Sequence, residues 1–215
     1  MGTVQTVDVY VLYFDVRGFV ARFLSEGQHA LDQLRGFQKA ARAGFEFSRP
    51  HSLVVTLYDN VWARVNASQP GAPSLVLDYA GKVMSAAEEF GYPNFYGAVT
   101  RGLHDFDPDD RMLVAKESLE DITEQHMDMT SEPHIRAVLA EKCLKRHTEL
   151  GNVVWVSSEV LGAESLDALL YPDSTFQARG DPVDLRHIVD TDSHGWSFTQ
   201  SLFYPIRPRS PRGAQ

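Results

Sequence analysis

Cysteine is nearly absent from this chain of 215 residues, which contains only Cys143. A single cysteine excludes an intramolecular disulfide, and such a chain is typical of a reducing compartment. The sequence also lacks a basic, apolar leader and any window near the ~20 apolar residues that a membrane-spanning helix requires. We therefore expect a cytoplasmic protein with no membrane partner.

Positive charge is also scarce, because 20 lysines and arginines stand against 29 acidic residues, for a net charge of −9. A protein that binds nucleic acid polymers through their phosphates is usually basic, so we expect no such partner. An acidic protein that handles a nucleotide must bring metal ions to the phosphates. The glycine-rich phosphate loop with its Gly-Lys-Ser/Thr ending is missing, which argues against a P-loop kinase or GTPase.

Repeats, low-complexity tracts and obvious linkers are missing too. The chain is long enough for one domain with a real core. We expect a single domain over residues 1–206. The basic, proline-rich residues 207–215 are expected to form a flexible tail.

The first part of this domain reads as a strand followed by two helices. Residues 7–14 are apolar on both alternating faces, as in a central strand that is covered on both sides. Helical spacing begins at Phe19 and is broken at Gly27. Ser25 and Gln28 resemble a capping box that would open the second helix.

The rest of the domain mixes strands and helices. Residues 51–66 predict two strands around a turn at Asp59-Asn60, since both residue types tolerate left-handed backbone angles. The remaining expected elements are a helix over 74–91 capped by Ser74, strands over 95–103 and 112–116, a helix over 133–150, a strand and short helix over 153–161, and an antiparallel pair over 183–189 and 197–206. This order predicts an α+β fold in which helices cover one sheet.

Two acids stand at chemically useful places. Asp15 ends the first strand, and Asp59 lies in the hairpin turn 44 residues later (59 − 15 = 44). If the strands are neighbours, both carboxylates lie at one end of the sheet, where they can chelate Mg²⁺. Each acid alone is more often a helix cap or a turn residue, but their order and strand contexts together favour a metal site. The amides that follow Asp15 at the helix start would face a triphosphate.

Several motifs carry a resemblance to a known family. FDVRGF (14–19) resembles the first metal motif of class III nucleotidyl cyclases, and LYDNVWARV (57–65) resembles their second metal hairpin, with Tyr58 where the family has Gly or Ser. FYGAVTRGL (95–103) and VVWVSSEVL (153–161) are similar to two further strands of the family. The resemblance covers about residues 7–162.

The resemblance implies a fold and a metal centre. The fold would be ferredoxin-like, with a mostly antiparallel central sheet, helices and a C-terminal β extension. Asp15 and Asp59, with the carbonyl of Val16, would hold two Mn²⁺ or Mg²⁺ ions on a nucleoside triphosphate. The catalytic domains would form a homodimer in which one chain supplies the metal ligands and the other supplies base and late-helix contacts.

Other parts of the resemblance concern the substrate. The substrate-binding turn around the triphosphate would be formed by Phe14, Arg17, Gly18 and Phe19. Purine cyclases place Lys or Glu four residues before the second metal acid, where this chain has Val55.

A valine cannot read a purine edge through hydrogen bonds, which favours a pyrimidine base. Arg49 and Asn60 are candidate donors to its carbonyl group.

The late helix also departs from the family, which has Asn and then Arg four residues on. Here the nearest register pairs Glu141 with Lys145, and Arg146 is the alternative cation. A cation at this place would still stabilise phosphate charge, although with a different shape from arginine.

A short cyclase with a non-purine base site resembles the pyrimidine cyclases of Pycsar anti-phage systems. The resemblance implies conversion of UTP to cyclic UMP and pyrophosphate, with the product acting on a downstream cyclic-nucleotide-sensing effector. A cytidylate cyclase, a purine cyclase, or a degenerate domain that signals without catalysis are the alternatives.

Overall fold

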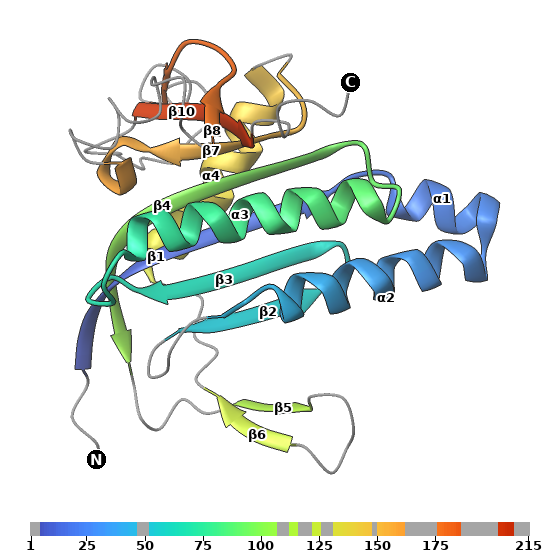
Figure 1. Ribbon diagram of the computed structural model, residues 1–215, viewed down its shortest axis with the longest axis horizontal. Helices are drawn as coiled ribbons and strands as arrows, with labels where there is room; N and C mark the ends of the chain where they lie inside the picture. Colours follow the sequence, from blue (N-terminus) through green and yellow to red (C-terminus); the bar gives the residue numbers. More distant parts are fainter. Residues whose placement is uncertain are drawn as a thin grey trace, which may run out of the picture.

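The computed structural model describes residues 5–46, 52–106, 112–115, 122–125, 131–147, 150–161, 176–185 and 202–208. Its main sheet has eight strands, of which seven follow the order β2-β3-β1-β4-β7-β10-β8, while β9 pairs with β10 (Figure 1). The strands of this sheet are β1 (Gln5–Val16), β2 (Leu53–Leu57), β3 (Asn60–Asn66), β4 (Phe95–Phe106), β7 (Val153–Ser157), β8 (Phe176–Ala178), β9 (Val183–Asp184) and β10 (Leu202–Pro208). Only the β4–β7 pair among them is parallel, so the expected α+β, mostly antiparallel sheet is confirmed.

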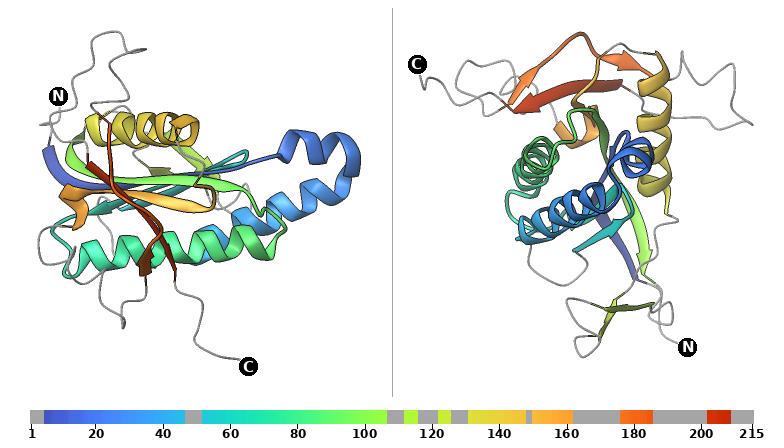
Figure 2. Two further views of the ribbon diagram at one scale, coloured as in Figure 1. Left: turned by 90° about the horizontal axis from the view of Figure 1, so that it is seen from above. Right: turned by 90° about the vertical axis from the view of Figure 1, so that its right-hand side faces the viewer.

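Helices cover both faces of this sheet (Figure 2). The helices are α1 (Phe19–Glu26), α2 (Gln28–Ala43), α3 (Ala72–Glu89) and α4 (Glu132–His147). Helices α2 and α3 lie on one face, and α4 lies on the other. The first strand, β1, is therefore central and covered twice, as its apolar residues on both faces predict.

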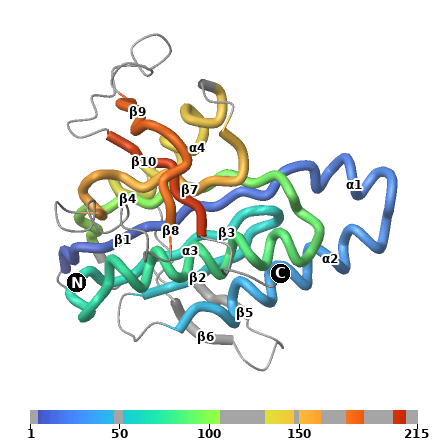
Figure 3. Tube along the Cα trace, turned by 45° about the horizontal axis from the view of Figure 1, so that its top comes forward, coloured from blue at the N-terminus to red at the C-terminus, as the bar shows by residue number. Residues whose placement is uncertain are grey.

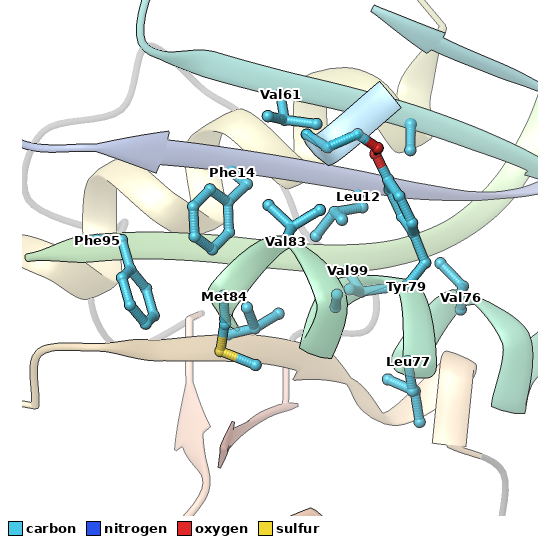
Figure 4. Close-up of a cluster of buried hydrophobic side chains, with 14 of the residues drawn as sticks. Leu12, Phe14, Val61, Val76, Leu77, Tyr79, Val83, Met84, Phe95 and Val99 are labelled. Atoms are coloured by element: carbon cyan, nitrogen blue, oxygen red, sulfur yellow. The ribbon is translucent and has the colours of Figure 1, made fainter. Parts of the chain in front are cut away.

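The side chains of β1 alternate between two cores because successive residues of a strand point to opposite faces. Leu12 and Phe14 join the large cluster beneath α2 and α3, together with Tyr79 and Met84 of α3 (Figure 4). Val11 and Tyr13 face α4 instead and cluster around Ala137. Asp15 is the next residue after Tyr13 on this second face, so the alternation of β1 places that acid on the α4 side.

The two expected helix caps are not used. Ser25 donates back to the carbonyls of Ala21 and Arg22 inside α1, and Gly27 separates α1 from α2. Ser74 lies inside α3, which begins two residues earlier at Ala72. In both cases a glycine with positive φ marks the start of the helix and takes the place of a side-chain cap.

The α1–α2 hairpin projects beyond the end of the sheet (Figure 3). No residue of α1 is buried, although its expected apolar spacing is present. Val20, Phe23 and Leu24 are exposed. The helix is held at its side by Arg22, which donates to the carbonyl of Gly91 at 2.7 Å.

The C-terminal β extension is present, with a different extent from the expected pair. β9 covers only two residues, and β10 also pairs with β8, which the sequence patterns did not predict. β10 continues to Pro208, past the expected start of the tail at residue 207, because Arg207 and Pro208 still pair with Gln177 and Phe176 of β8.

Strands β5 (Met112–Ala115) and β6 (Ile122–Gln125) form a separate antiparallel pair, of which β6 was not predicted. None of the helices within the described ranges has the length and apolar character needed to cross a membrane.

Candidate metal and nucleotide site

Asp15 and Asp59 lie together at one end of the sheet, as the sequence predicts. β1 pairs with β3, and in that register Asp15 stands opposite Asn60, the residue after Asp59. The amide of Val16 donates to the carbonyl of Asp59 at 3.0 Å. The first strand and the hairpin turn are thus joined by the backbone at the position of the two acids.

The turn that carries Asp59 lies one residue earlier than expected. The residues between β2 and β3 are Tyr58 and Asp59, and Asn60 already belongs to β3. Tyr58 is 80% exposed and has a φ of +52°, which is unfavourable for a bulky residue. The side-chain amide of Gln38 on α2 donates to the carbonyl of Tyr58 at 2.7 Å and holds the turn in place.

Asn60 orients the carboxylate of Asp59. Its Nδ2 donates to Oδ1 of Asp59 at 3.0 Å, and its Oδ1 accepts a 2.5 Å hydrogen bond from the hydroxyl of Tyr13. Burial, followed by the charge of Asp15, raises the pKa of Tyr13, so the phenol stays protonated and acts as the donor. These two bonds use the oxygen and one N–H of the Asn60 amide, and the expected role of Asn60 as a donor to the base stays a prediction.

Tyr13 was not singled out in the sequence. The available signal was its place two residues before Asp15, on the same face of β1.

Asp15 has a charged partner on α4. Nζ of Lys145 lies 3.5 Å from Oδ2 of Asp15 and 2.8 Å from Oε1 of Glu141. Burial, then the charge of Glu141 and then that of Asp59 together raise the pKa of Asp15 to about 6, against the opposing effect of Lys145. The carboxylate of Asp15 is thus costly to ionise until a cation compensates it.

This contact is made within one chain. The family resemblance implies that the late-helix cation serves the partner's site, whereas Lys145 lies beside Asp15 of its own chain. Arg146, the alternative cation, is exposed, and no ion pair or hydrogen bond joins it to another described residue. Of the two candidates, Lys145 is the one that the fold brings to the acids.

The start of α1 offers backbone amides next to Asp15. The first hydrogen bond within α1 runs from the amide of Arg22 to the carbonyl of Gly18, so the amides of residues 19–21 have no partner inside the helix. The amides of Val16 and Arg17 donate to the carbonyls of Asp59 and Asn94, so these two amides of the expected anion-binding turn are already used within the protein. Gly18 has a φ of +83°, a conformation that favours glycine.

The other residues expected at this turn take different positions. The guanidinium of Arg17 lies over the ring of Tyr96, 4.4 Å from its centroid. Phe19 is partly buried against the main core. Phe14 is fully buried and stacks on Phe95 at 5.1 Å, on the face opposite Asp15, so its side chain cannot reach a substrate at the acids. The expected substrate contact of Phe14 is wrong for its side chain.

Val55 lies on the same face of the sheet as Asp15. It stands opposite Trp62 in the β2–β3 register and is 7% exposed, and Trp62 in turn contacts Tyr13 with ring centroids 4.5 Å apart. The surface of the sheet around Val55 is therefore apolar and aromatic. Arg49, the other expected base donor, lies outside the described residues.

The donor atoms fit hard divalent cations in kind but are few. Carboxylate oxygens are the ligands that Mg²⁺ and Mn²⁺ prefer. The part of the chain that the structure describes contains no group of three or more His, Cys, Asp or Glu side chains that could hold a metal. Two acids with a backbone carbonyl suit an ion whose remaining ligands are phosphate oxygens and water.

The fold is that of nucleotide cyclase domains. The chain is similar to the adenylyl cyclase CyaB from P. aeruginosa, with 12% identity, 98% of each chain covered and a TM-score of 0.58. It is similar to the guanylate cyclase domain of RhGC from Catenaria anguillulae, solved with GTP, at 12% identity and a TM-score of 0.55, covering 96% of this chain and 100% of that one.

A bacterial light-regulated adenylyl cyclase is a third structure with this fold. It has 10% identity and a TM-score of 0.52, and the match covers 94% of this chain and 52% of that one. No family model and no curated protein matches the sequence.

Proposed function

We propose that this protein is a metal-dependent nucleotide cyclase that converts a nucleoside triphosphate, preferably UTP, to a 3′,5′-cyclic nucleotide and pyrophosphate. The observation that carries the proposal is that Asp15 and Asp59 lie together at one end of the sheet, beside the open amides of α1, in a cyclase fold. Asp15, Asp59 and the carbonyl of Val16 would hold two Mg²⁺ or Mn²⁺ ions. When bound, these ions would polarise the α-phosphate and neutralise charge on the triphosphate.

The chain's own residues position the reacting groups. In the reaction the ribose 3′-oxygen forms a bond to the α-phosphorus, pyrophosphate leaves, and the hydroxyl proton is released. Such a transfer depends on alignment and charge neutralisation more than on a side-chain nucleophile. Asn60 fixes one oxygen of Asp59, the start of α1 offers amides to phosphate oxygens, and Lys145 supplies a positive charge beside Asp15.

The preference for a pyrimidine is supported by Val55. This side chain has no hydrogen-bonding group, and its neighbour Trp62 adds an apolar, aromatic surface. A purine-reading carboxylate or ammonium is thus missing at this position of β2. We propose UTP as the preferred substrate, with CTP next and ATP and GTP poor.

The assembly and the cellular role follow from the family resemblance. We propose a homodimer in the cytoplasm whose product, cyclic UMP, is an anti-phage second messenger sensed by a separate effector. Exposed apolar side chains near the acids support the dimer, because a second copy would remove them from water. These side chains are Val20, Phe23 and Leu24 of α1, and Leu57 and Tyr58 before Asp59. Light scattering at assay concentration tests the dimer, and an active monomer would contradict it.

Two other candidates have specific support. A purine cyclase is favoured by the similar solved structures, which are adenylyl and guanylate cyclases. A non-catalytic domain is favoured by Glu141 and Lys145, which stand where the family has Asn and Arg.

One assay separates these candidates. Equal concentrations of the four triphosphates are incubated together with Mn²⁺ or Mg²⁺, and the cyclic products are resolved by mass. The Asp15→Asn/Asp59→Asn double variant serves as the blank. We expect cyclic UMP to dominate. Dominant cyclic AMP or cyclic GMP would leave only the cyclase proposal standing, and no product above the blank would contradict catalysis itself.

A further inference from the structure

Lys145 lies between two carboxylates of different character. Asp15 belongs to the sheet end where substrate would bind, and its side chain is 16% exposed, whereas the Glu141 side chain, one helical turn before Lys145 on α4, is 1% exposed. The ammonium contacts both at once, at 3.5 Å and 2.8 Å. The ammonium of Lys145 is thus held by the buried Glu141 and faces Asp15 at the end of the sheet.

Glu141 keeps Lys145 at this place. A buried carboxylate is costly unless it is paired, and neither oxygen of Glu141 has a hydrogen bond of good geometry within the described residues. The 2.8 Å approach of Lys145 is therefore a charge contact without an aligned hydrogen bond, and it is the one ion pair of Glu141 in that part of the chain. Complete withdrawal of Lys145 would leave a buried negative charge without compensation.

Divalent ions compete with this arrangement. An ion bound by Asp15 would lie within a few ångströms of the ammonium that now contacts the same carboxylate, and two positive charges at such separations repel. Lys145 must then leave Asp15. Because Glu141 retains it, the ammonium can pivot but cannot leave the site. A triphosphate bound across the acids would offer it new negative oxygens within reach.

We propose that Lys145, anchored by Glu141, acts as an internal cation that disfavours metal binding until a triphosphate arrives, and so couples the two binding events. This inference rests on the proposed cyclase function. In the nucleotide-free protein, Lys145 neutralises Asp15 and weakens metal binding. With a triphosphate bound, the displaced ammonium contacts phosphate oxygens, so the penalty disappears. By linkage, the metal strengthens triphosphate binding by the same factor.

The test is direct measurement of Mn²⁺ binding, by the electron paramagnetic resonance signal of free Mn²⁺, with and without 3′-deoxyuridine triphosphate. This nucleotide lacks the attacking hydroxyl and cannot be cyclised, and a nucleotide-only titration corrects for Mn²⁺ that it binds alone. Lys145→Met is compared with Lys142→Met, a matched control at an exposed lysine on the same helix.

We expect Lys145→Met to bind Mn²⁺ roughly tenfold more tightly than the wild type without nucleotide, and to lose most of the tightening that nucleotide gives the wild type. Lys142→Met should match the wild type. Unchanged or weaker Mn²⁺ binding by Lys145→Met without nucleotide would overturn the proposal. Since Lys145→Met leaves Glu141 unpaired, the double variant Lys145→Met/Glu141→Gln, which removes both charges, is measured in parallel and should show the same tightening.

An Asp15→Asn variant separates the two levels of inference. If wild-type Mn²⁺ binding does not depend on Asp15, the proposed metal site, and with it the cyclase mechanism, fails. If binding depends on Asp15 but is indifferent to Lys145, the metal site stands and the coupling role of Lys145 is rejected.

Discussion

The amide of Val16 donates a 3.0 Å hydrogen bond to the carbonyl of Asp59, so the main chains that carry the two acids are tied to each other directly. The separation of the acids is therefore set by sheet pairing and does not depend on a mobile loop. Chemistry that requires two carboxylates at a fixed spacing is well served by such rigid elements.

Replacing either acid should abolish cyclisation without unfolding the protein. Asp15→Asn and Asp59→Asn each remove a carboxylate from the site while leaving the shape of the side chain, so we expect turnover to fall on the order of 10²-fold or more. Asp32→Asn on α2, where the carboxylate is exposed, is the matched control and should be fully active. Circular dichroism checks the fold. Near-normal turnover in either site variant would reject the two-acid mechanism.

Asp15 should destabilise the metal-free protein at neutral pH. Its folded pKa of about 6 lies above the ordinary aspartate value of 3.8, so ionisation costs folding free energy that is fully expressed above pH 6 and shrinks as pH falls toward 3.8. After allowance for solvent screening, Asp15→Asn should be more stable than the wild type by about 1–2 kcal/mol at pH 8 and by less at pH 5. Urea unfolding in the presence of a chelator measures this. A variant less stable than the wild type at pH 8 would contradict the assignment.

Metal binding should weaken on acidification through pH 6. A proton on Asp15 competes with the ion, and the raised pKa of this carboxyl brings that competition close to neutral pH. Mn²⁺ affinity should therefore rise with pH between about 5 and 7 and then level off. Calorimetric titration at several pH values checks the curve. An affinity that is already constant from pH 5 upward would show that Asp15 titrates lower in the metal-free protein.

Mixing Asp15→Asn chains with Lys145→Met chains should not raise the activity above that of the two variants alone. Lys145 contacts Asp15 of its own chain, so an Asp15→Asn chain and a Lys145→Met chain each carry a damaged site. The activity of co-refolded mixtures should stay near that of the two variants alone. When Asp15→Asn chains are mixed with wild-type chains, the activity should equal that of the wild-type chains present. Recovery of about one active site per mixed dimer would instead place Lys145 in the partner's site.

A charge at Val55 should harm pyrimidine turnover. Val55 is buried opposite Trp62, so Val55→Lys would place an ammonium in an apolar wall without a partner. We expect kcat/KM for UTP to fall at least roughly tenfold, which corresponds to about 1.4 kcal/mol. Val55→Met, which has a similar length to the lysine but carries no charge, is the control. Unchanged UTP turnover in folded Val55→Lys would separate this residue from the base site.

The sequence by itself determined which secondary-structure elements carry the two acids. The two-sided apolar run before Asp15 predicted a central strand, the change to helical spacing at Phe19 predicted α1, and the hairpin pattern predicted that Asp59 would lie at a turn. These signals are local, since strand alternation, helical period and turn composition each depend on a few neighbouring residues. Their outcomes differ from the predictions by only one or two residues, as at Tyr58 and Ala72.

Tertiary structure alone decided which side chains meet the acids. Strand alternation already puts Tyr13 and not Phe14 on the face of Asp15, but only the tertiary structure decides that α4 covers this face, because both faces of β1 are apolar and the local pattern does not tell which helix packs on which face. The contact between Lys145 and Asp15 joins residues 130 positions apart through the packing of α4 on the sheet. The sequence could name Lys145 and Arg146 as rival cations, but only the rotation of α4 about its axis, set by its buried residues, directs Lys145 toward the site.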